Sequence, residues 1–308
     1  MALWPDLLIS SLRDPANGCF RARVADELRG VSRIRGRKLV DEDLEETLER
    51  REFVRLALVT AGMASRAAFG AEPEQKVAES EFYQLRTYTL RTGPQIALTQ
   101  NYFEKALIPA LNRLEMSPVG AFKLDIGPET PTFYVLIPAS SAEALIALDS
   151  RLGKDAEYVK AASGFRDAPA SAPAFVRAER TLLSAFSGWP KVVAPKKEKR
   201  IFQLRTYESP SQVAHTRKIQ MFNEAEIAIF VRTGLTPVFF ADTLIGTRMP
   251  NLTYMLTFAD TAELKEKWAA FSADPAWREL SHKPGNTDAE IVSNISNLYL
   301  SPLSCSQI

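Results

Sequence analysis

Two short stretches of the chain carry the side chains best suited to binding chemistry. In each stretch a glutamine, an arginine and a tyrosine stand at alternate positions. The two sets are Gln84, Arg86 and Tyr88 in the first stretch, and Gln203, Arg205 and Tyr207 in the second. Alternate residues of a strand share one face, so each set should project to one side. Such a surface suits an anionic or aromatic small molecule; the alternative is an internal salt-bridge layer that fixes the register of two halves.

The residues on the opposite face of each strand predict where these arginines lie. Tyr83, Leu85 and Thr87 form the more apolar face in the first stretch, and we expect helices to cover it. The two polar sets would then face each other in the space between two sheets. A buried, unpaired charge is strongly destabilising, so each arginine needs a carboxylate or a bound anion. The carboxylates considered for this role are Glu179, Asp125 and Asp242.

The two stretches belong to an internal repeat. Gln84 and Gln203 are 119 residues apart, and the same offset aligns further pairs without a gap. Those pairs include Phe103 with Phe222, Pro118 with Pro237, Ile126 with Ile245, Pro131 with Pro250, and Asp155 with Asp274. One offset held over that span indicates two copies of a single structural unit.

Both copies predict the same order of elements. Alternating apolar residues indicate strands near 81–90, 119–126, 132–138 and 175–186, and again near 200–208, 238–244, 252–258 and 290–300. Helical spacing indicates a helix over 96–114, kinked at Pro109, and its counterpart over 212–233, with a second helical region in each copy. The order β-α-β-β-α-β is the split βαβ, ferredoxin-like motif. The predicted class is therefore α+β, with two tandem units covering each other sheet to sheet.

The predicted organisation has four parts. Residues 1–79 form a mostly unstructured leader, 80–187 the first domain, 188–199 a linker exposed to solvent, and 200–304 the second domain. In the leader, Arg50, Arg51 and Phe53 resemble the twin-arginine export signal, and a short Ala-rich apolar run follows them. This predicts export to the periplasm or the extracellular space. The alternative is an ordinary amphipathic helix that begins with two arginines.

Composition excludes several classes of function. Lys and Arg number 38 against 37 Asp and Glu, so nothing indicates a nucleic-acid partner. The apolar run over 56–71 is too short for a stable membrane span. We expect no metal and no cofactor, because the chain has two histidines and no Cys/His cluster. His215 is predicted to be solvated on its helix. A haem-binding protein with His282 or His215 as axial ligand is the alternative.

Taken together, these features resemble the NIPSNAP family. The residues that carry the resemblance are the paired strand stretches, the doubled β-α-β-β-α-β order and the sequence Asp274-Pro275-Ala276-Trp277. It covers about residues 81–301, and the first copy departs from it at Asp155-Ala156-Glu157-Tyr158. The resemblance implies a pseudo-dimeric α/β barrel. It brings no agreed catalytic residues.

Three functions are compatible with this reading. The first is binding of a small molecule or protein partner through the barrel. The second is a cofactor-poor, monooxygenase-like enzyme, in which Arg86, Tyr88, Arg205 and Tyr207 position the substrate. The third is the haem-binding protein named above. Association of the pseudo-dimer into a homo-oligomer is left open.

Overall fold

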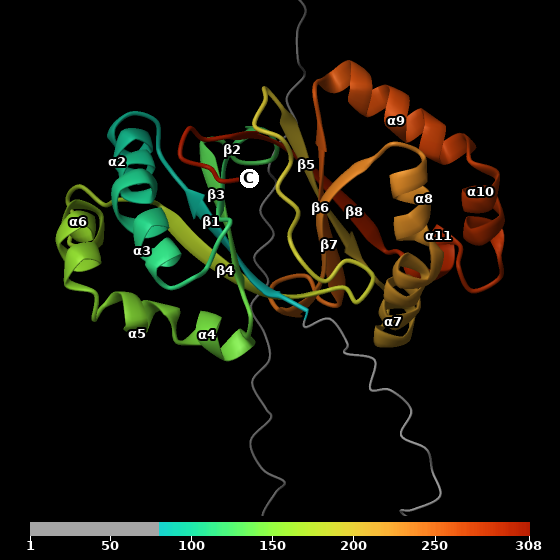
Figure 1. Cartoon of the computed structure of the whole chain (residues 1–308), viewed down its shortest axis with the longest axis horizontal. Helices are drawn as coiled ribbons and strands as arrows, with labels where there is room; N and C mark the ends of the chain where they lie inside the picture. Colours follow the sequence, from blue (N-terminus) through green and yellow to red (C-terminus); the bar gives the residue numbers. More distant parts are fainter. Residues whose placement is uncertain (1–79) are drawn as a thin grey trace, which may run out of the picture. The chain divides into compact units, whose positions relative to one another are not determined.

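The computed structural model describes residues 80–308, all of which belong to one unit, Lys76–Ile308 (Figure 1). The first copy contains β1 (Phe82–Thr89), α2 (Pro94–Tyr102), η1 (Phe103–Leu107), α3 (Ile108–Arg113), β2 (Gly120–Ile126), β3 (Thr132–Ala139), α4 (Ala142–Ile146), α5 (Leu148–Leu152), α6 (Ala156–Arg166) and β4 (Arg177–Ala185). The second copy contains β5 (Ile201–Glu208), α7 (Gln212–Met221), η2 (Phe222–Glu226), α8 (Ile227–Arg232), β6 (Thr236–Ile245), β7 (Asn251–Phe258), α9 (Thr261–Ala273), α10 (Pro275–His282), α11 (Asp288–Ile291) and β8 (Asn294–Pro302).

The eight strands form one closed antiparallel barrel in the order β1-β3-β2-β8-β5-β7-β6-β4. Within each copy the order is that of a ferredoxin-like sheet. The copies are joined where β2 pairs with β8 and where β4 pairs with β6. Each copy thus closes the free sheet edges of the other, which removes exposed edges altogether. The predicted fold class, tandem ferredoxin-like units forming a pseudo-dimeric α/β barrel, is confirmed.

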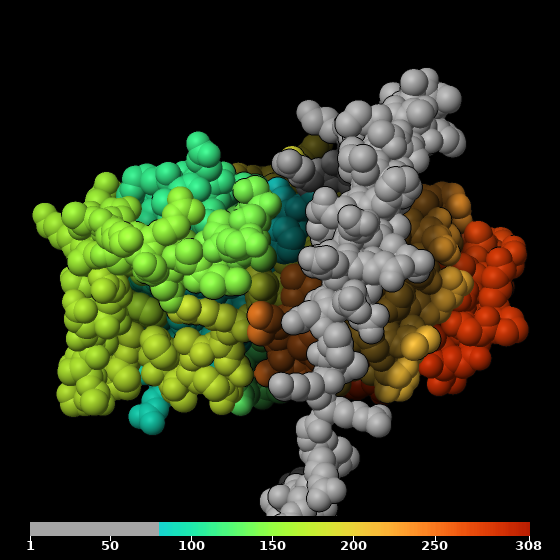
Figure 2. Space-filling model, turned by 90° about the horizontal axis from the view of Figure 1, so that it is seen from below, coloured from blue at the N-terminus to red at the C-terminus, as the bar shows by residue number. Residues whose placement is uncertain are grey.

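The core has an inner part and two outer parts. Tyr83, Leu85, Phe202 and Leu204 belong to the inner cluster, to which strands of both copies contribute. The outer clusters lie between the strands and the helices of each copy, which flank the barrel on opposite sides (Figure 1). Figure 2 shows the first copy, green to yellow, beside the second, orange to red. Alternation along each strand therefore divides its residues between the barrel interior and one helix layer.

The long helix of each copy contains one widened turn. The π-helical segments η1 and η2 begin at Phe103 and Phe222, which the 119-residue offset aligns. The predicted kink at Pro109 coincides with the start of α3, directly after η1. The second copy has Ala228 at the position of Pro109 and keeps the same π segment. The irregularity is therefore a property of the repeat unit, and the proline is not its cause.

An aspartate caps the same helix in both copies. Asp155 accepts from the backbone N–H of Tyr158 at the start of α6, and Asp274 accepts from those of Ala276 and Trp277 at the start of α10. An arginine pairs with each cap, Arg113 with Asp155 at 2.6 Å and Arg232 with Asp274 at 2.7 Å. The backbone and arginine hydrogen bonds lower the pKa of the Asp155 carboxyl, and those of Arg232 and the backbone lower that of Asp274. The aligned aspartates thus perform the same local task.

Most of the linker, residues 188–199, is exposed, but two of its side chains pack on the core. Trp189 packs against the outer cluster of the second copy, and Val192 packs against the inner cluster. The backbone N–H of Val193 donates to the carbonyl of Val238 at 2.9 Å. Among residues 80–308, no helix has the length and apolarity needed to cross a membrane.

Candidate functional site

The two polar sets point in the opposite direction from the predicted one. Gln84 donates to the carbonyl of Leu145 in α4 at 3.3 Å, and Arg86 donates to Asp149 in α5 at 3.1 Å. Tyr88 belongs to the cluster under the helices of the first copy. In the second copy, Trp268 of α9 donates to Gln203 at 2.8 Å. The sets therefore face the helix layers, and the prediction that they meet each other inside the barrel is wrong.

The physical reason for this orientation lies in the barrel interior. The interior is lined by apolar side chains of both copies, including Tyr83, Leu85, Phe202 and Leu204. A guanidinium pointing inward would lose its hydration without gaining a partner, which is strongly unfavourable. Pointing outward, Arg86 reaches a carboxylate on the helix layer. The more apolar face of each strand therefore lines the barrel interior, and the helices cover the polar face.

The carboxylates predicted to serve these arginines have other partners. Glu179 pairs with Arg177, Asp125 with Lys123 and Asp242 with His215. Arg86 instead pairs with Asp149 and accepts support from Gln84, to whose side-chain oxygen its Nε donates at 2.6 Å. Arg205 forms no ion pair with any residue in the range 80–308. It donates to the Tyr207 hydroxyl at 2.9 Å and lies over the Trp268 ring, with Cζ 4.4 Å from the ring centroid.

Arg86 and Tyr88 line a cavity of about 310 Å³ in the first copy. Its walls come from β1, β4, α2, α5 and α6 and from the loops around them. The aromatic lining residues are Tyr88, Tyr102, Tyr158, Phe165 and Phe175, and the charged ones are Arg86, Asp149, Arg166 and Arg180. We call this cavity the Arg86 pocket. It brings together two predicted residues, whereas Gln84 supports Arg86 from beside it.

The aromatic walls of the Arg86 pocket are held in a fixed arrangement. Tyr102 stacks on Phe165 with ring centroids 4.0 Å apart and planes at 5°. The hydroxyls of Tyr102 and Tyr158 are 2.9 Å apart, so one donates to the other. Burial raises the pKa of Tyr102 well above its ordinary value and also raises the pKa of Tyr158. Both phenols are therefore neutral at physiological pH, and the one that accepts in this pair keeps its own proton free to donate to a ligand.

The electrostatics of the pocket are dominated by arginine. Arg86 is 2% exposed, and it shares Asp149 with Arg180 of β4. Burial acts to lower the pKa of Arg86, but the neighbouring phenols of Tyr88 and Tyr102 and the Asp149 carboxylate outweigh it and raise that pKa. Arg166 lies over the Tyr158 ring, its Cζ 5.9 Å from the centroid. Three guanidinium groups therefore face one carboxylate, and the pocket carries an excess of positive charge.

Comparison with known proteins places the chain in a family. The NIPSNAP family model matches residues 83–171 and 202–307, one match in each structural copy. The chain belongs to the NIPSNAP family. A search of curated proteins gave no match. The resemblance drawn from the strand stretches and from Asp274-Pro275-Ala276-Trp277 is confirmed.

Solved structures share the fold of this NIPSNAP chain at low sequence identity. A protein from Fusobacterium nucleatum, provisionally named a monooxygenase, is 6% identical with a TM-score of 0.51, over 74% of this chain and 94% of its own. A similarly named protein from Lactobacillus acidophilus is 8% identical with a TM-score of 0.48, over 73% and 94%. An uncharacterised NIPSNAP-like domain protein from Burkholderia xenovorans is 23% identical with a TM-score of 0.31, over 34% and 87%. The Fusobacterium match, with its TM-score above 0.5, shows a common fold and no more.

The histidines lie away from the Arg86 pocket. His215, predicted to be solvated, is 2% exposed, and its Nε2 is 2.7 Å from Asp242 of β6. That prediction is wrong, because the side chain faces the barrel strands and not solvent. A buried ring whose Nε2 already binds a carboxylate is unsuited to be a haem ligand. His282 is exposed at the end of α10, where its Nδ1 is 2.7 Å from the carbonyl of Arg278. In the range 80–308, no three acidic, His or Cys side chains gather at a spacing that suits a metal ion.

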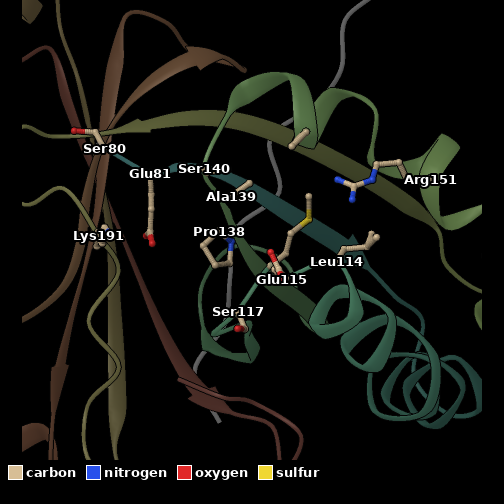
Figure 3. Close-up of a pocket in the computed structure, with 12 residues that line it drawn as sticks. Ser80, Glu81, Leu114, Glu115, Ser117, Pro138, Ala139, Ser140, Arg151 and Lys191 are labelled. Carbon is tan, nitrogen blue, oxygen red and sulfur yellow. The ribbon is translucent and has the colours of Figure 1, made fainter. Parts of the chain in front are cut away.

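A second cavity, of about 280 Å³, lies beside the first residues of β1 (Figure 3). Its charged lining residues are Glu81 just before β1, Glu115 just after α3, Arg151 of α5 and Lys191 of the linker. Glu115 has φ 60°, a left-handed conformation, where the aligned residue of the second copy is Gly234 with φ 83°. Glycine is the residue that adopts this helix-ending conformation without strain. The charged groups here are mainly exposed, so water can solvate them and a ligand is not required.

Several residues of the Arg86 pocket were missed by the sequence reasoning. Tyr102, Asp149, Arg166 and Arg180 are not among the site residues predicted from the sequence, and Tyr158 was named only as part of the first copy's departure from the family sequence. One signal could have found two of them, namely the 119-residue offset itself. It places Asp149 opposite Trp268 and Tyr158 opposite Trp277, two changes of character within otherwise matched elements. A repeat that conserves Arg and Tyr on its strand but changes the facing helix residues points to a difference between the two sites.

Proposed function

We propose that this NIPSNAP protein binds a small organic anion in the Arg86 pocket. The observation that carries the proposal is a buried guanidinium, 2% exposed, at the wall of an aromatic cavity of about 310 Å³. Cavities of this size with few, well-placed polar groups are typical ligand sites. Because arginines outnumber carboxylates in the lining of the pocket, the ligand should carry a negative charge. Hydrogen bonds from a guanidinium to an anion are about twice as strong as neutral ones.

The proposal is tested first on the protein purified from its own host. Native mass spectrometry of the wild-type chain should show a retained small molecule. Replacing Arg86 by Leu should remove that molecule, because the pocket loses its buried guanidinium. Replacing Arg205 by Leu should leave it bound, since Arg205 is the aligned residue of the other copy and does not line this cavity. Circular dichroism melts show whether each variant is folded.

Two results would contradict the proposal. One is a folded Arg86→Leu protein that retains the same molecule in the same amount. The other is loss of the molecule from Arg205→Leu alone, which would place the ligand in the second copy. If Arg86→Leu does not fold, Arg180→Leu replaces it, because Arg180 lines the same cavity from a half-exposed position.

Catalysis on the bound molecule is a second candidate function. The observation that favours it is the Tyr102–Tyr158 hydroxyl pair, 2.9 Å apart within the pocket. The phenol that accepts within the pair can donate its proton to charge that develops on a bound anion. The Fusobacterium protein of similar fold is provisionally named a monooxygenase, so oxygen uptake is the first activity to assay. Oxygen uptake with the retained molecule that falls in Tyr102→Phe, with binding unchanged, would favour the enzyme.

We also propose that the protein is exported, which the twin arginines support. Arg50, Arg51 and Phe53 lie outside the described residues, so this proposal depends on the sequence alone. Replacing both arginines by lysine should keep the protein inside the cell, because the twin-arginine route reads the pair itself. Fractionation of cells that express the tagged wild type and the double variant measures this. Equal amounts of both proteins in the exported fraction would refute it.

A further inference from the structure

Each copy contains a version of the same site, and the two versions differ in the residues that face the arginine. Four pairs of positions are related by the 119-residue offset: Arg86 and Arg205, Tyr88 and Tyr207, Asp149 and Trp268, and Tyr158 and Trp277. The arginine and the tyrosine are kept on the strand in both copies. The helix residues that face them are an aspartate and a tyrosine in the first copy and two tryptophans in the second.

In the second copy the protein's own side chains occupy the space in front of the arginine. The indole of Trp268 lies 4.4 Å from Cζ of Arg205 and donates to Gln203 at 2.8 Å. The Lys218 ammonium lies 5.3 Å from the ring centroid of Tyr207 and 5.5 Å from that of Trp277. An aromatic ring thus rests against the guanidinium, an arrangement favoured by cation–π attraction.

In the first copy the cavity is open, and three of the corresponding side chains, Asp149, Tyr158 and Thr99, are smaller. Asp149 stands in place of Trp268 and holds the edge of the Arg86 guanidinium at Nη2. Thr99 stands in place of Lys218, so no ammonium enters the site. In front of the arginine, the second copy thus places an indole ring and a cation that the first copy lacks.

We infer that the ligand of the Arg86 pocket is a planar aromatic anion, and that Trp268 closes the aligned site of the second copy. This inference rests on the proposed binding function. The ligand's ring contacts Arg86 and the pocket's aromatic side chains, as Trp268 contacts Arg205. Its negative group meets Arg166, which makes no ion pair with any residue in the range 80–308 and lies beside Tyr158 in the pocket wall. Each chain consequently binds one molecule.

The test uses three probes on the full-length chain. They are 2-naphthoate, the neutral analogue 2-naphthylmethanol, and the non-aromatic anion cyclohexanecarboxylate, each titrated by calorimetry. We expect one 2-naphthoate per chain, bound at least tenfold more tightly than either analogue, which corresponds to about 1.4 kcal/mol. The analogues separate the contribution of the charge from that of the ring.

Variants then locate the ring and the charge. Asp149→Trp should build the second copy's closure into the first and weaken 2-naphthoate binding at least tenfold. Trp268→Ala should open the second copy and raise the stoichiometry to two, with the second molecule bound more weakly because Gly285 stands there in place of Arg166. Arg166→Gln, an exposed position expected to fold normally, should weaken 2-naphthoate but not 2-naphthylmethanol. Arg151→Gln, in the second cavity, should change nothing and serves as the matched control.

The outcomes separate the inference from the proposed function. Equal affinity for 2-naphthoate and cyclohexanecarboxylate would overturn the aromatic class while leaving an anion site. No binding of any probe, with a retained anion still seen by native mass spectrometry, would likewise overturn only the inference. Unchanged 2-naphthoate affinity in both Asp149→Trp and Arg166→Gln would show that the probe binds elsewhere. No probe bound and no molecule retained would remove the proposed function as well.

Discussion

Replacing Lys218 by Met is expected to lower the free energy of unfolding by about 3–5 kcal/mol. Lys218 and Glu226 are buried in the second copy, with side chains 1% exposed each and Nζ 3.1 Å from the carboxylate. Three rings, those of Tyr207, Phe222 and Trp277, lie within 5.5 Å of the ammonium. Removing the lysine leaves the buried Glu226 carboxylate with neither water nor its ion-pair partner. An unpaired buried charge of this kind is strongly destabilising.

The same variant should depend on pH in a defined direction. Burial raises the pKa of Glu226, and Lys218 partly opposes that rise. Without the lysine the folded pKa lies further above the unfolded value, so the folded protein holds the proton more tightly. Stability is then highest below the unfolded pKa of about 4.3 and is lost as pH rises through the folded value. The deficit relative to wild type should therefore be largest near pH 7 and smaller near pH 5.

Urea denaturation at the two pH values measures both effects. The double variant Lys218→Met with Glu226→Gln should recover much of the loss, because no buried charge remains. Lys267→Met is the matched control, since Lys267 pairs with Glu266 at 3.9 Å on the surface and should lose less than about 1 kcal/mol. A loss this small at Lys218, or a double variant no better than the single one, would contradict the account. The first copy has Thr99 and Leu107 at these positions, so the fold itself does not require the pair.

The fold could be predicted because its information is local and repeated. Strand alternation, glycine and proline at the turns, and the aspartate caps each act over a few residues. The 119-residue offset then shows that these local signals recur in the second copy. Even the joining of the copies follows, because a ferredoxin-like sheet alone leaves one face uncovered. Because gene duplication placed two copies of each local signal in one chain, the architecture could be predicted from a single sequence.

The candidate site could be predicted only in part, because its decisive contacts are distant in sequence. Arg86 and Tyr88 were correctly singled out, but both faces of their strand carry aromatic residues. The direction in which the Arg86 side chain points is decided by its hydrogen bond to Asp149, a residue 63 positions away on a helix. His215 was misplaced for a similar reason. Its polar neighbours suggested solvent, yet Lys218, one turn further on, is itself buried. Local composition does not reveal which charged residues find a buried partner.

Replacing Phe222 by Ala is expected to lower the free energy of unfolding by about 3–5 kcal/mol. Phe222 is 0% exposed at the start of η2. Its ring lies within 6.2 Å of five others, those of Phe186, Tyr207, Phe230, Phe240 and Tyr254. Truncation leaves a cavity that these neighbours, held by the barrel and by one another, can fill only in part. Val231→Ala, at a position 52% exposed on the following helix, should cost little and serves as the control.

The form of the Phe222→Ala transition tests the closed barrel itself. Three of the four tryptophans, Trp189, Trp268 and Trp277, lie in the linker and the second copy, whereas far-UV circular dichroism reports helices and strands of both copies. Because β2 pairs with β8 and β4 with β6, loss of the second copy exposes two strand edges of the first and half of the shared interior. The fluorescence and dichroism curves should therefore shift together and stay coincident. A fluorescence curve that moves to lower denaturant while part of the dichroism change keeps its wild-type midpoint would mean that each copy folds alone. The shared interior would then contribute little to stability, despite the strand pairing that closes it.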